Sequence, residues 1–291
     1  MEIWLAQRFG DSAGDADFPF AAVALRGETI AEPAETYWLR ADPVHLSVNR
    51  DRVVLMDASQ LAITDAESTA LIASMGEHFK SDGLNFFAAH PQRWYLRSNN
   101  PILLHTQPVS AVRGRSVTQH WFDGDDRKLW QTRLSEMQML LHAHPINEAR
   151  ETAGELPING VWFWGEGKPP SGLKKPYAHI VASDPLLAGC ALLASARYTD
   201  MNQFRWSDVS QIEADNVLIV VDQLATLAAY AEWDAWQSAL AALDHAWFGP
   251  GLSALKNGQI KTLRIYVPSK ERSKKLTTTR TDLFKFWRRS K

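Results

Sequence analysis

Cysteine is nearly absent from this chain of 291 residues, because Cys190 is the only one. One cysteine excludes an intrachain disulfide, and such scarcity is typical of proteins from a reducing compartment. The sequence also lacks the apolar run of about 18 residues that a transmembrane helix requires. Its start, MEIWLAQRFGDSAGDADFPF, has no basic region followed by an apolar stretch. We therefore expect no signal peptide, no membrane partner and a cytoplasmic protein.

Several motifs that carry chemistry are missing as well. The sequence has no Gly-x-Gly-x-x-Gly and no Gly-Lys-Ser/Thr. Cys190 lies in the apolar stretch GCALLASA, which favours a small buried residue over a nucleophile. His142 and His144 are two residues apart, so on a helix their side chains diverge by about 200°. No Asp or Glu joins them at ligand spacing, so we expect no metal site there.

The charge of the chain is unevenly distributed over a globular composition of 45% hydrophobic and 22% charged residues. Residues 261–291 contain eleven Lys or Arg against two acidic residues, a net charge of +9. Because the whole chain carries −2, the other 260 residues carry −11. Two interpretations stay open: a nucleic-acid or anionic-surface contact, and a basic tail that lies on the protein's own acidic body.

The first half of the chain predicts an α+β subdomain, which we place at residues 1–150. Short apolar runs between turn residues predict strands at 19–27, 44–48, 52–57, 84–91 and 93–98. A helix is predicted over 64–80, with Thr64 as its N-cap and acidic residues in its first turn. Another is predicted over 125–142 and ends before Pro145. Its apolar face consists of Trp130, Leu134, Met137 and Leu141.

The second half alternates strands and helices, which predicts an α/β core with a mostly parallel sheet at residues 151–268. The predicted strands are 160–164, 179–183, 216–221 and 260–268, and the predicted helices are 184–196 and 232–247. Asp184 and Pro185 are a favoured opening for the first of these helices. Asp222 follows a buried strand, where catalytic carboxylates are often found in parallel sheets. A loop or cap role is the more common one for such a residue.

Residues 269–291 form a basic tail that ends in TTTRTDLFKFWRRSK. We expect its apolar residues to dock on the core as a short amphipathic helix, because four apolar residues in five positions are unfavourable to expose. These residues are Leu283, Phe284, Phe286 and Trp287. Single-stranded nucleic acid is the alternative partner, since its binding also uses aromatic and arginine side chains.

Two further segments supply candidate binding residues. In INGVWFWGEGKPP, residues 158–170, a glycine loop follows a strand, but prolines rather than a helix come next. A core strand with Trp162 and Trp164 on one face and a glycine turn is therefore favoured. In HPINEAR, Asn147 and Arg150 suit either an oxyanion or a structural hydrogen-bond network, because arginine pairs with phosphate and carboxylate groups.

The order of these two segments resembles the archaeal-type cofactor-independent phosphoglycerate mutases of the alkaline-phosphatase superfamily. Those enzymes have a similar His-Pro-x-Asn-x-x-Arg and a similar Asn-x-x-Trp-x-Trp-Gly-x-Gly-x-x-Pro. ADPVHLSVNRDRVVLMD resembles their inserted substrate domain, and YWLRADPVHL with DLFKFWRR resembles proteobacterial Rpf-type regulatory or mutase-like proteins. The resemblance spans residues 37–290 and implies a truncated alkaline-phosphatase-like sheet beside an α+β subdomain. It also implies a site for a small phosphorylated or carboxylated ligand, formed by Asn49, Asn147, Arg150, Trp162, Trp164, Gly165 and Gly167.

Departures from the mutase pattern argue against catalysis. The mutases use two metal ions. They have an Asp-Gly metal segment and a segment with a serine nucleophile, and we find neither feature in residues 1–35. Their remaining ligands fall near Val220, Asp222 and TLAAY, where only one acidic residue is present. We therefore expect no catalytic residue, metal or cofactor, and a regulatory protein that binds a small anionic ligand or a protein partner. The alternatives are an active mutase or phosphatase with unrecognised ligands, and a regulator that contacts nucleic acid through its tail.

Overall fold

A computed structural model describes residues 1–10, 18–28, 30, 35–49, 52–117, 122–268 and 273–284, with only the backbone of Asn49. The protein has a mixed α/β fold and divides into two compact units, which are described separately. The larger unit comprises Glu2–Pro176 and Asp184–Arg197. The smaller unit comprises Met1, Tyr177–Ser183 and Tyr198–Lys291.

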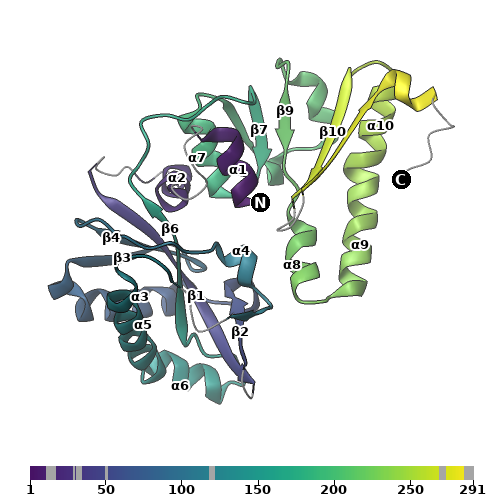
Figure 1. Ribbon diagram of the computed structural model, residues 1–291. Coiled ribbons are helices and arrows are strands. Elements are labelled where there is room, and N and C mark those ends of the chain that lie inside the picture. The colour runs from purple at the N-terminus through teal and green to yellow at the C-terminus, as the bar shows by residue number, and fades with distance from the viewer. Residues whose placement is uncertain are drawn as a thin grey trace. The chain divides into compact units, whose positions relative to one another are not determined.

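A six-stranded antiparallel sheet built around the long strand β1 (Tyr37–Asn49) forms the centre of the larger unit (Figure 1). One edge of β1 pairs first with β4 (Arg93–Ser98) and then with β2 (Arg52–Asp57). Strand β6 (Gly160–Gly167) pairs with the opposite edge. Two outer strands complete the sheet, β3 (Leu84–His90) on β4 and β5 (Ser116–Val117) on β2. Residues 160–167 follow the domain boundary predicted near residue 150, but they pair with β1 and belong to the larger unit, whose first segment extends to Pro176.

The alternation of side chains along β1 and β6 gives the sheet two buried faces. The first face packs against helices α3 (Asp65–His78) and α5 (Arg127–His142). Its core residues include Leu39, Ala41, Leu96, Val161 and Phe163, together with the predicted stripe of α5. The second face carries the side chains of Val44, Leu46, Leu55, Trp162 and Trp164. Phe20 of helix α2 (Phe20–Gly27) packs on it.

The structure confirms the predicted N-cap residues of α3 and α7 and the predicted end of α5. Thr64 and Glu67 form a reciprocal capping box at the start of α3. The side chain of Asp184 accepts a hydrogen bond of 2.8 Å from the Leu186 N–H at the start of α7 (Pro185–Leu193). Helix α5 ends at His142, before Pro145, as predicted. Pro145 then opens a further helix, α6 (Pro145–Thr152), which sequence analysis did not predict.

The strand predicted over residues 19–27 is wrong, because this segment forms helix α2. Its residues from Ala21 to Leu25 are all buried, so the sequence shows a continuous apolar run instead of a helical period. Helix α2 crosses α7 at very short range. A Cβ atom added at Gly189 would lie 1.8 Å from the Val23 carbonyl oxygen, and one at Gly27 would lie 1.9 Å from the Pro185 carbonyl oxygen. These two glycines allow the helix backbones to touch.

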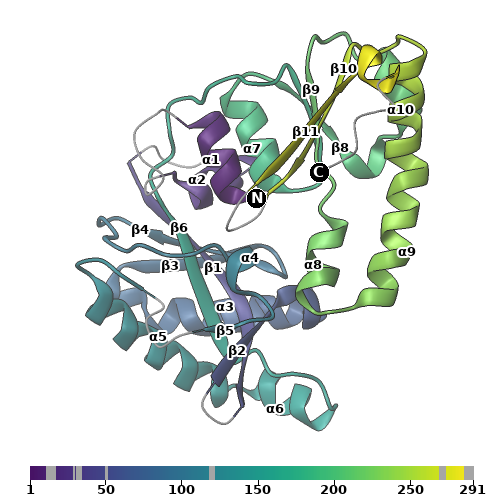
Figure 2. The ribbon, with the colours of Figure 1, turned by 45° about the vertical axis from the view of Figure 1, so that its right-hand side comes forward.

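The smaller unit contains a short sheet, a helical segment and a hairpin. Strand β7 (His179–Ala182) pairs in parallel with β9 (Val217–Ile219) as predicted, and β8 (Arg197–Asp200) joins the same sheet. Helix α8 (Gln223–Ala229) precedes a helical run that consists of α9 (Trp233–Leu243), a π-helical turn (Asp244–Phe248) and α10 (Gly249–Lys256). The predicted closing strand β10 (Thr262–Val267) pairs antiparallel with β11 (Lys274–Thr279), which was not predicted, and contacts α10 (Figure 2).

Part of the basic tail lies outside the described residues. The predicted docking helix extends into residues 285–291, of which the structure gives no description. Within the described part, Arg280–Phe284 form a 3₁₀ turn and Phe284 is 70% exposed. None of the helices in the described ranges is long and apolar enough to cross a bilayer.

We expect Gly189→Ala to lower the free energy of unfolding by about 1–3 kcal/mol, because its Cβ would force α2 away from α7. Gly76→Ala is the matched control, since Gly76 lies inside α3 with nothing within 4 Å of an added Cβ. This control should raise the free energy of unfolding by about 0.5–1 kcal/mol through helix propensity. Urea unfolding measures both changes. Equal changes in the two variants would contradict the close crossing.

Candidate functional site

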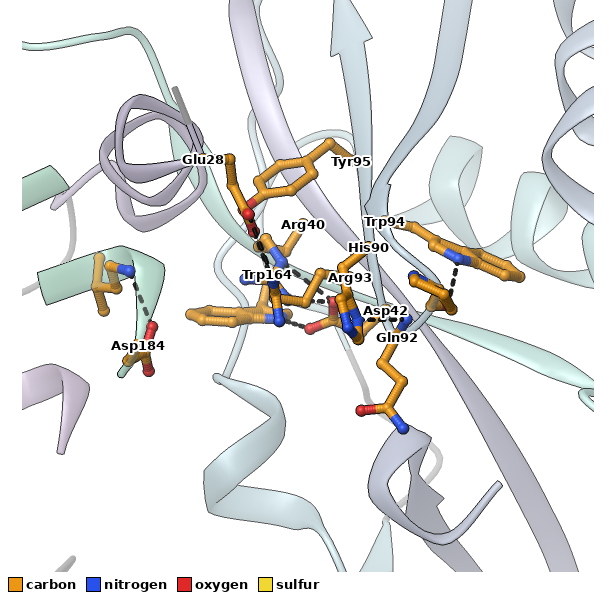
Figure 3. Close-up of polar contacts among 12 residues, drawn as sticks. Glu28, Arg40, Asp42, His90, Gln92, Arg93, Trp94, Tyr95, Trp164 and Asp184 are labelled. Carbon is orange, nitrogen blue, oxygen red and sulfur yellow. Dashed lines mark hydrogen bonds and ion pairs between the residues drawn. The ribbon is translucent and has the colours of Figure 1, made fainter. Parts of the chain in front are cut away.

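A buried ion pair lies on the second face of the sheet, beneath α2. Arg40 and Asp42 are two residues apart on β1, so their side chains share this face. The Arg40 Nε and Nη2 atoms donate to Asp42 Oδ1 at 3.1 and 2.5 Å. The indole N–H of Trp164 donates to the other carboxylate oxygen, Asp42 Oδ2, at 2.7 Å (Figure 3). Arg40 is 6% exposed and Asp42 is 4% exposed, so the pair is closed to solvent.

Aromatic rings flank the guanidinium of Arg40 on both sides. The sheet register places Tyr95 of β4 and Trp164 of β6 directly opposite Arg40. The Arg40 Cζ atom lies 4.9 Å from the Tyr95 ring centroid and 5.3 Å from the Trp164 ring centroid, within cation–π range. Phe87 stacks on Tyr95 at 5.4 Å, and Phe20 of α2 lies 6.0 Å from Trp164. We call Arg40 and these four rings the aromatic row.

A second ion pair joins the end of α2 to strand β4. Arg93 donates to the two carboxylate oxygens of Glu28 from Nε at 2.6 Å and from Nη2 at 3.2 Å. The Tyr95 hydroxyl donates to Glu28 at 3.4 Å. Glu28 follows directly after α2, so these bonds hold the helix over the aromatic row (Figure 3).

The protonation of the cluster follows from burial and pairing. Burial raises the pKa of Asp42, and the Arg40 guanidinium and the Trp164 N–H oppose this rise. Burial by itself would lower the pKa of Arg40, but the Asp42 carboxylate outweighs it and the pKa rises. Burial also raises the pKa of Tyr95. Arg40 and Tyr95 therefore hold their protons more tightly than usual, which does not suit either one for proton transfer near neutral pH.

Asn147 and Arg150, two predicted site residues, lie in α6 and bind the segment that leads into β6. Asn147 is 2% exposed; its Nδ2 atom donates to the Leu141 and Ile158 carbonyls at 2.8 and 2.9 Å. Its Oδ1 atom accepts from the Ile158 N–H at 2.8 Å. These three bonds fix the start of β6 against the end of α5, as a structural hydrogen-bond network does. A ligand at Asn147 stays a prediction.

Arg150 is 3% exposed and its guanidinium is shared among several acceptors. The Nε atom donates to the Leu156 carbonyl at 2.9 Å, and Nη2 donates to the Leu61 carbonyl. The Nη1 atom donates to Glu67 of α3 at 2.8 Å. Burial opposes ionisation of Glu67, but the Thr64 N–H and the Arg150 guanidinium outweigh it and lower the pKa of Glu67. Arg150 therefore joins α6 to α3, and its role in ligand binding stays a prediction.

Four further predicted residues lie in β6, and three of them, Trp164, Gly165 and Gly167, lie against the start of α2. Trp162 donates from its indole N–H to the Gln107 carbonyl at 2.8 Å. Gly165 and Gly167 have positive φ angles of 73° and 148°. A Cβ atom at Gly165 would lie 2.8 Å from Phe20 Cβ, and one at Gly167 would lie 2.6 Å from Pro19 Cβ. The glycines thus let α2 approach the strand. The side chain of Asn49 lies outside the described residues.

A small cavity adjoins the aromatic row on the same face. Its volume is about 220 Å³, and its lining residues are Trp38, Asn85, Phe86, Phe87 and Arg97. We call it the Arg97 slot. The Nε atom of Arg97 is buried and has no hydrogen-bond partner among the described residues. Neither Arg97 nor the Arg40–Asp42 pair is among the residues predicted from the sequence. Their signal in the sequence is the presence of charged residues within the otherwise apolar strands YWLRADPV and RWYLRS.

Other candidates from the sequence lie elsewhere. Cys190 is buried in α7, and burial raises the pKa of its thiol, which fits a small core residue. Asp222 is exposed at the N-cap position of α8. In the described ranges, no three His, Cys, Asp or Glu side chains are grouped so that they could hold a metal ion.

Comparison with known proteins finds similarity to phosphoglycerate mutases over part of the chain. A "Probable 2,3-bisphosphoglycerate-independent phosphoglycerate mutase" of Geobacter sulfurreducens is 27% identical over 135 residues, which cover 45% of this chain and 33% of that protein. The mutase of Methanosarcina mazei is 23% identical over 166 residues, covering 54% and 42%. The chain therefore matches less than half the length of these relatives. No protein-family model matches the sequence.

Two solved structures are also similar to this chain. A cofactor-independent phosphoglycerate mutase from Thermoplasma acidophilum is 16% identical with a TM-score of 0.41, over 84% of this chain and 74% of the other. A protein of Pyrococcus horikoshii is 13% identical with a TM-score of 0.44, over 84% and 64%. The sequence comparisons confirm the expected similarity to cofactor-independent mutases. The resemblance to Rpf-type regulatory proteins stays a prediction.

We expect Arg40→Met and Asp42→Asn each to lower the free energy of unfolding by about 3–5 kcal/mol, because each leaves one charge buried without its partner. The double variant should lose much less free energy of unfolding than the two single variants together. Its amide oxygen at position 42 still accepts from Trp164, and it buries no charge. Urea unfolding of the four proteins measures the coupling.

Glu35→Gln is the control for the ion-pair experiment. The Glu35–Lys168 pair has a similar distance of 2.8 Å, but the Glu35 side chain is 88% exposed. Solvent screens such a pair, so no measurable loss of stability is expected. Additive effects of the two single changes at Arg40 and Asp42 would show that these residues are not coupled.

Proposed function

We propose that this chain is a non-catalytic, phosphoglycerate-mutase-like protein that acts by binding, as a regulatory protein does. Its similarity in sequence to known mutases supports the ancestry. The observation that carries the proposal is the use of its motif residues. The polar groups of Asn147, Arg150 and Trp164 form hydrogen bonds within the larger unit. These contacts build a scaffold.

The energetic cost of redirecting Arg150 supports the same conclusion. To bind a phosphate, its guanidinium would have to leave the Leu61 and Leu156 carbonyls and the Glu67 carboxylate. The Leu61 carbonyl is buried, and an acceptor left buried without a donor costs about 1–3 kcal/mol. The bonds to Leu156 and Glu67 are partly buried, so their loss costs less. An anion at this position would have to offset all of these losses. Arg150 therefore serves the scaffold better than it serves a ligand.

The alternative is an active mutase or phosphatase that uses unrecognised metal ligands. The resemblance to the alkaline-phosphatase superfamily implies that such an enzyme would use two metal ions. Two metal ions need several carboxylate and histidine ligands near one nucleophile. At the positions that the resemblance aligns with those ligands, the chain has Val220, Asp222 and the TLAAY stretch. Asp222 supplies one carboxylate. Because one carboxylate cannot hold two metal ions, we favour a binding role over catalysis.

Metal content and turnover test the proposal. The full chain is incubated with Mn²⁺, Zn²⁺ or Mg²⁺, desalted, and analysed for bound metal, and it is then assayed for phosphoglycerate isomerisation and phosphatase activity. We expect no stoichiometric metal and no turnover above that of the Asp222→Asn variant. Turnover that a chelator removes and that Asp222→Asn lowers would overturn the proposal. Arg150→Lys is a second control, for which we expect reduced unfolding stability and unchanged background turnover.

A further inference from the structure

The hairpin of β10 and β11 lies in a strongly basic part of the smaller unit. Residues 249–268 and 273–284 contain six Lys or Arg and one acidic residue, Asp282, which is a net charge of +5. The Asp282 carboxylate accepts from the N–H and the hydroxyl of Thr279 at 3.0 and 2.7 Å. Across the described part of the chain, none of the six cations has an acidic partner. Their charge is therefore open to a partner from outside.

The register of the hairpin gives it two different faces. Leu263 lies on the face toward α10, because its Cδ2 atom is 3.8 Å from the position of a Cβ atom at Gly251 of that helix (Figure 2). Arg264 and Tyr266 lie on the opposite face of β10, and Lys275 of β11 is paired with Tyr266. Arg264 and Lys275 are both exposed. We call this side of the hairpin the basic face. Its other members are Thr262, Thr277 and Thr279.

A cavity adjoins the basic face at the end of the hairpin remote from the loop between its strands. Its volume is about 280 Å³, and its lining residues are Gly258, Ile260, Lys261, Thr279, Arg280 and Thr281. Thr279 belongs to both the cavity and the basic face. The Arg280 Nη1 atom lies 3.4 Å from the position of a Cβ atom at Gly258, so the guanidinium reaches the turn that follows α10. Two cations thus line one hollow, as a site for an anionic group requires.

The cations follow one line along the hairpin. Lys275 lies opposite Tyr266, two residues from Arg264, and two further residues lead to the end that adjoins the cavity. Each step of two residues along a strand is about 6.8 Å. A single line of positive charge matches one phosphodiester backbone, whereas a duplex presents two. Tyr266 adds an aromatic ring within this line, and the Lys275 Nζ atom lies 5.7 Å from its centroid. Cations with interspersed aromatic rings are typical of surfaces that bind single strands.

We propose that the basic face and the adjoining cavity bind single-stranded nucleic acid. Arg264 and Lys275 contact successive phosphates, and a further phosphate lies in the cavity between Lys261 and Arg280. Such contacts read charge and not base sequence, so the binding is tolerant of sequence. The proposal names a partner for residues outside the segments that resemble the mutases. It therefore holds whether or not the chain catalyses a reaction.

Fluorescence anisotropy of labelled oligouridine and oligothymidine of about 20 nucleotides tests the proposal with the full chain. We expect saturable binding with a Kd on the order of 10 μM at about 50 mM salt. The slope of log K against log salt should be about −3, since four cations each contribute about −0.7. A duplex of the same length and vesicles of phosphatidylserine should bind at least fivefold more weakly. Duplex or vesicle binding as tight as that of the single strands, or no saturable binding up to about 100 μM, would overturn the proposal.

Paired substitutions connect this binding to the basic face. Arg264→Gln with Lys275→Gln should weaken binding about tenfold at low salt and make the salt slope shallower by about 1.4. Arg52→Gln with Lys128→Gln is the matched control, because it removes the same charges from exposed positions of the larger unit. The control should bind as the native chain does. Equal weakening by the two pairs would show a general effect of net charge and overturn the proposal.

Two further pairs separate the cavity from the basic tail. Lys261→Gln with Arg280→Gln should weaken binding about tenfold, as the loss of one bound phosphate predicts. Arg288→Gln with Arg289→Gln changes the tail alone and should weaken binding less than twofold. Thermal unfolding at the temperature of the native chain shows that each variant keeps its fold. Binding that the tail pair abolishes and the Arg264 and Lys275 pair leaves unchanged would overturn the assignment to the hairpin.

Discussion

The buried ion pair between Arg40 and Asp42 is the interaction on which the larger unit depends. A guanidinium removed from water needs a carboxylate and further contacts to offset its lost hydration. The strand supplies the carboxylate two residues later, on the same face. Trp164 then occupies the second carboxylate oxygen and, with Tyr95, covers the guanidinium. One polar cluster therefore fixes β6 and β4 to β1 while it satisfies its own charges.

Helix α2 closes over this cluster because the end of β6 is formed by glycine. Gly165 and Gly167 have backbone angles that other residues rarely adopt, and their missing side chains leave room for Pro19 and Phe20. At the start of the strand, the side-chain amide of Asn159 bonds both the N–H and the carbonyl of Leu46, at 2.7 and 3.1 Å. The side-chain amide thus takes the place of a backbone N–H and carbonyl, and it continues the hydrogen bonding between β1 and β6 by one residue. Asn159, Gly165 and Gly167 of the motif that resembles the mutases thus take part in building the sheet.

The sequence predicts those elements whose signals are local. Thr64 with Glu67 and Asp184 with Pro185 mark helix starts, and the spacing of Trp130 and Leu134 marks a buried helix face. The helix at residues 20–27 escapes prediction because it is covered on several sides and shows no polar face. Strand β11 escapes because KKLTTT lacks an apolar run, and its pairing with β10 decides its structure.

The candidate site is less accessible to sequence reasoning than the fold. Asn147 and Arg150 can be recognised as polar residues worth naming, but their acceptors are carbonyls that only tertiary structure brings near. The partners of Arg40 come from strands far along the chain, so the aromatic row has no local signature. The unsatisfied Nε of Arg97 is a property of the folded sheet alone.

The exchange rate of the Trp164 indole N–H tests most directly whether the cluster is a closed internal scaffold. Trp164→Phe assigns this signal among those of the twelve tryptophans, and NMR follows its exchange with deuterium in the absence and presence of phosphoglycerate. The account predicts protection similar to that of core amides in β1, and no change of rate or position when phosphoglycerate is added. Exchange as fast as that of an exposed indole, or a saturable shift with phosphoglycerate, would contradict it.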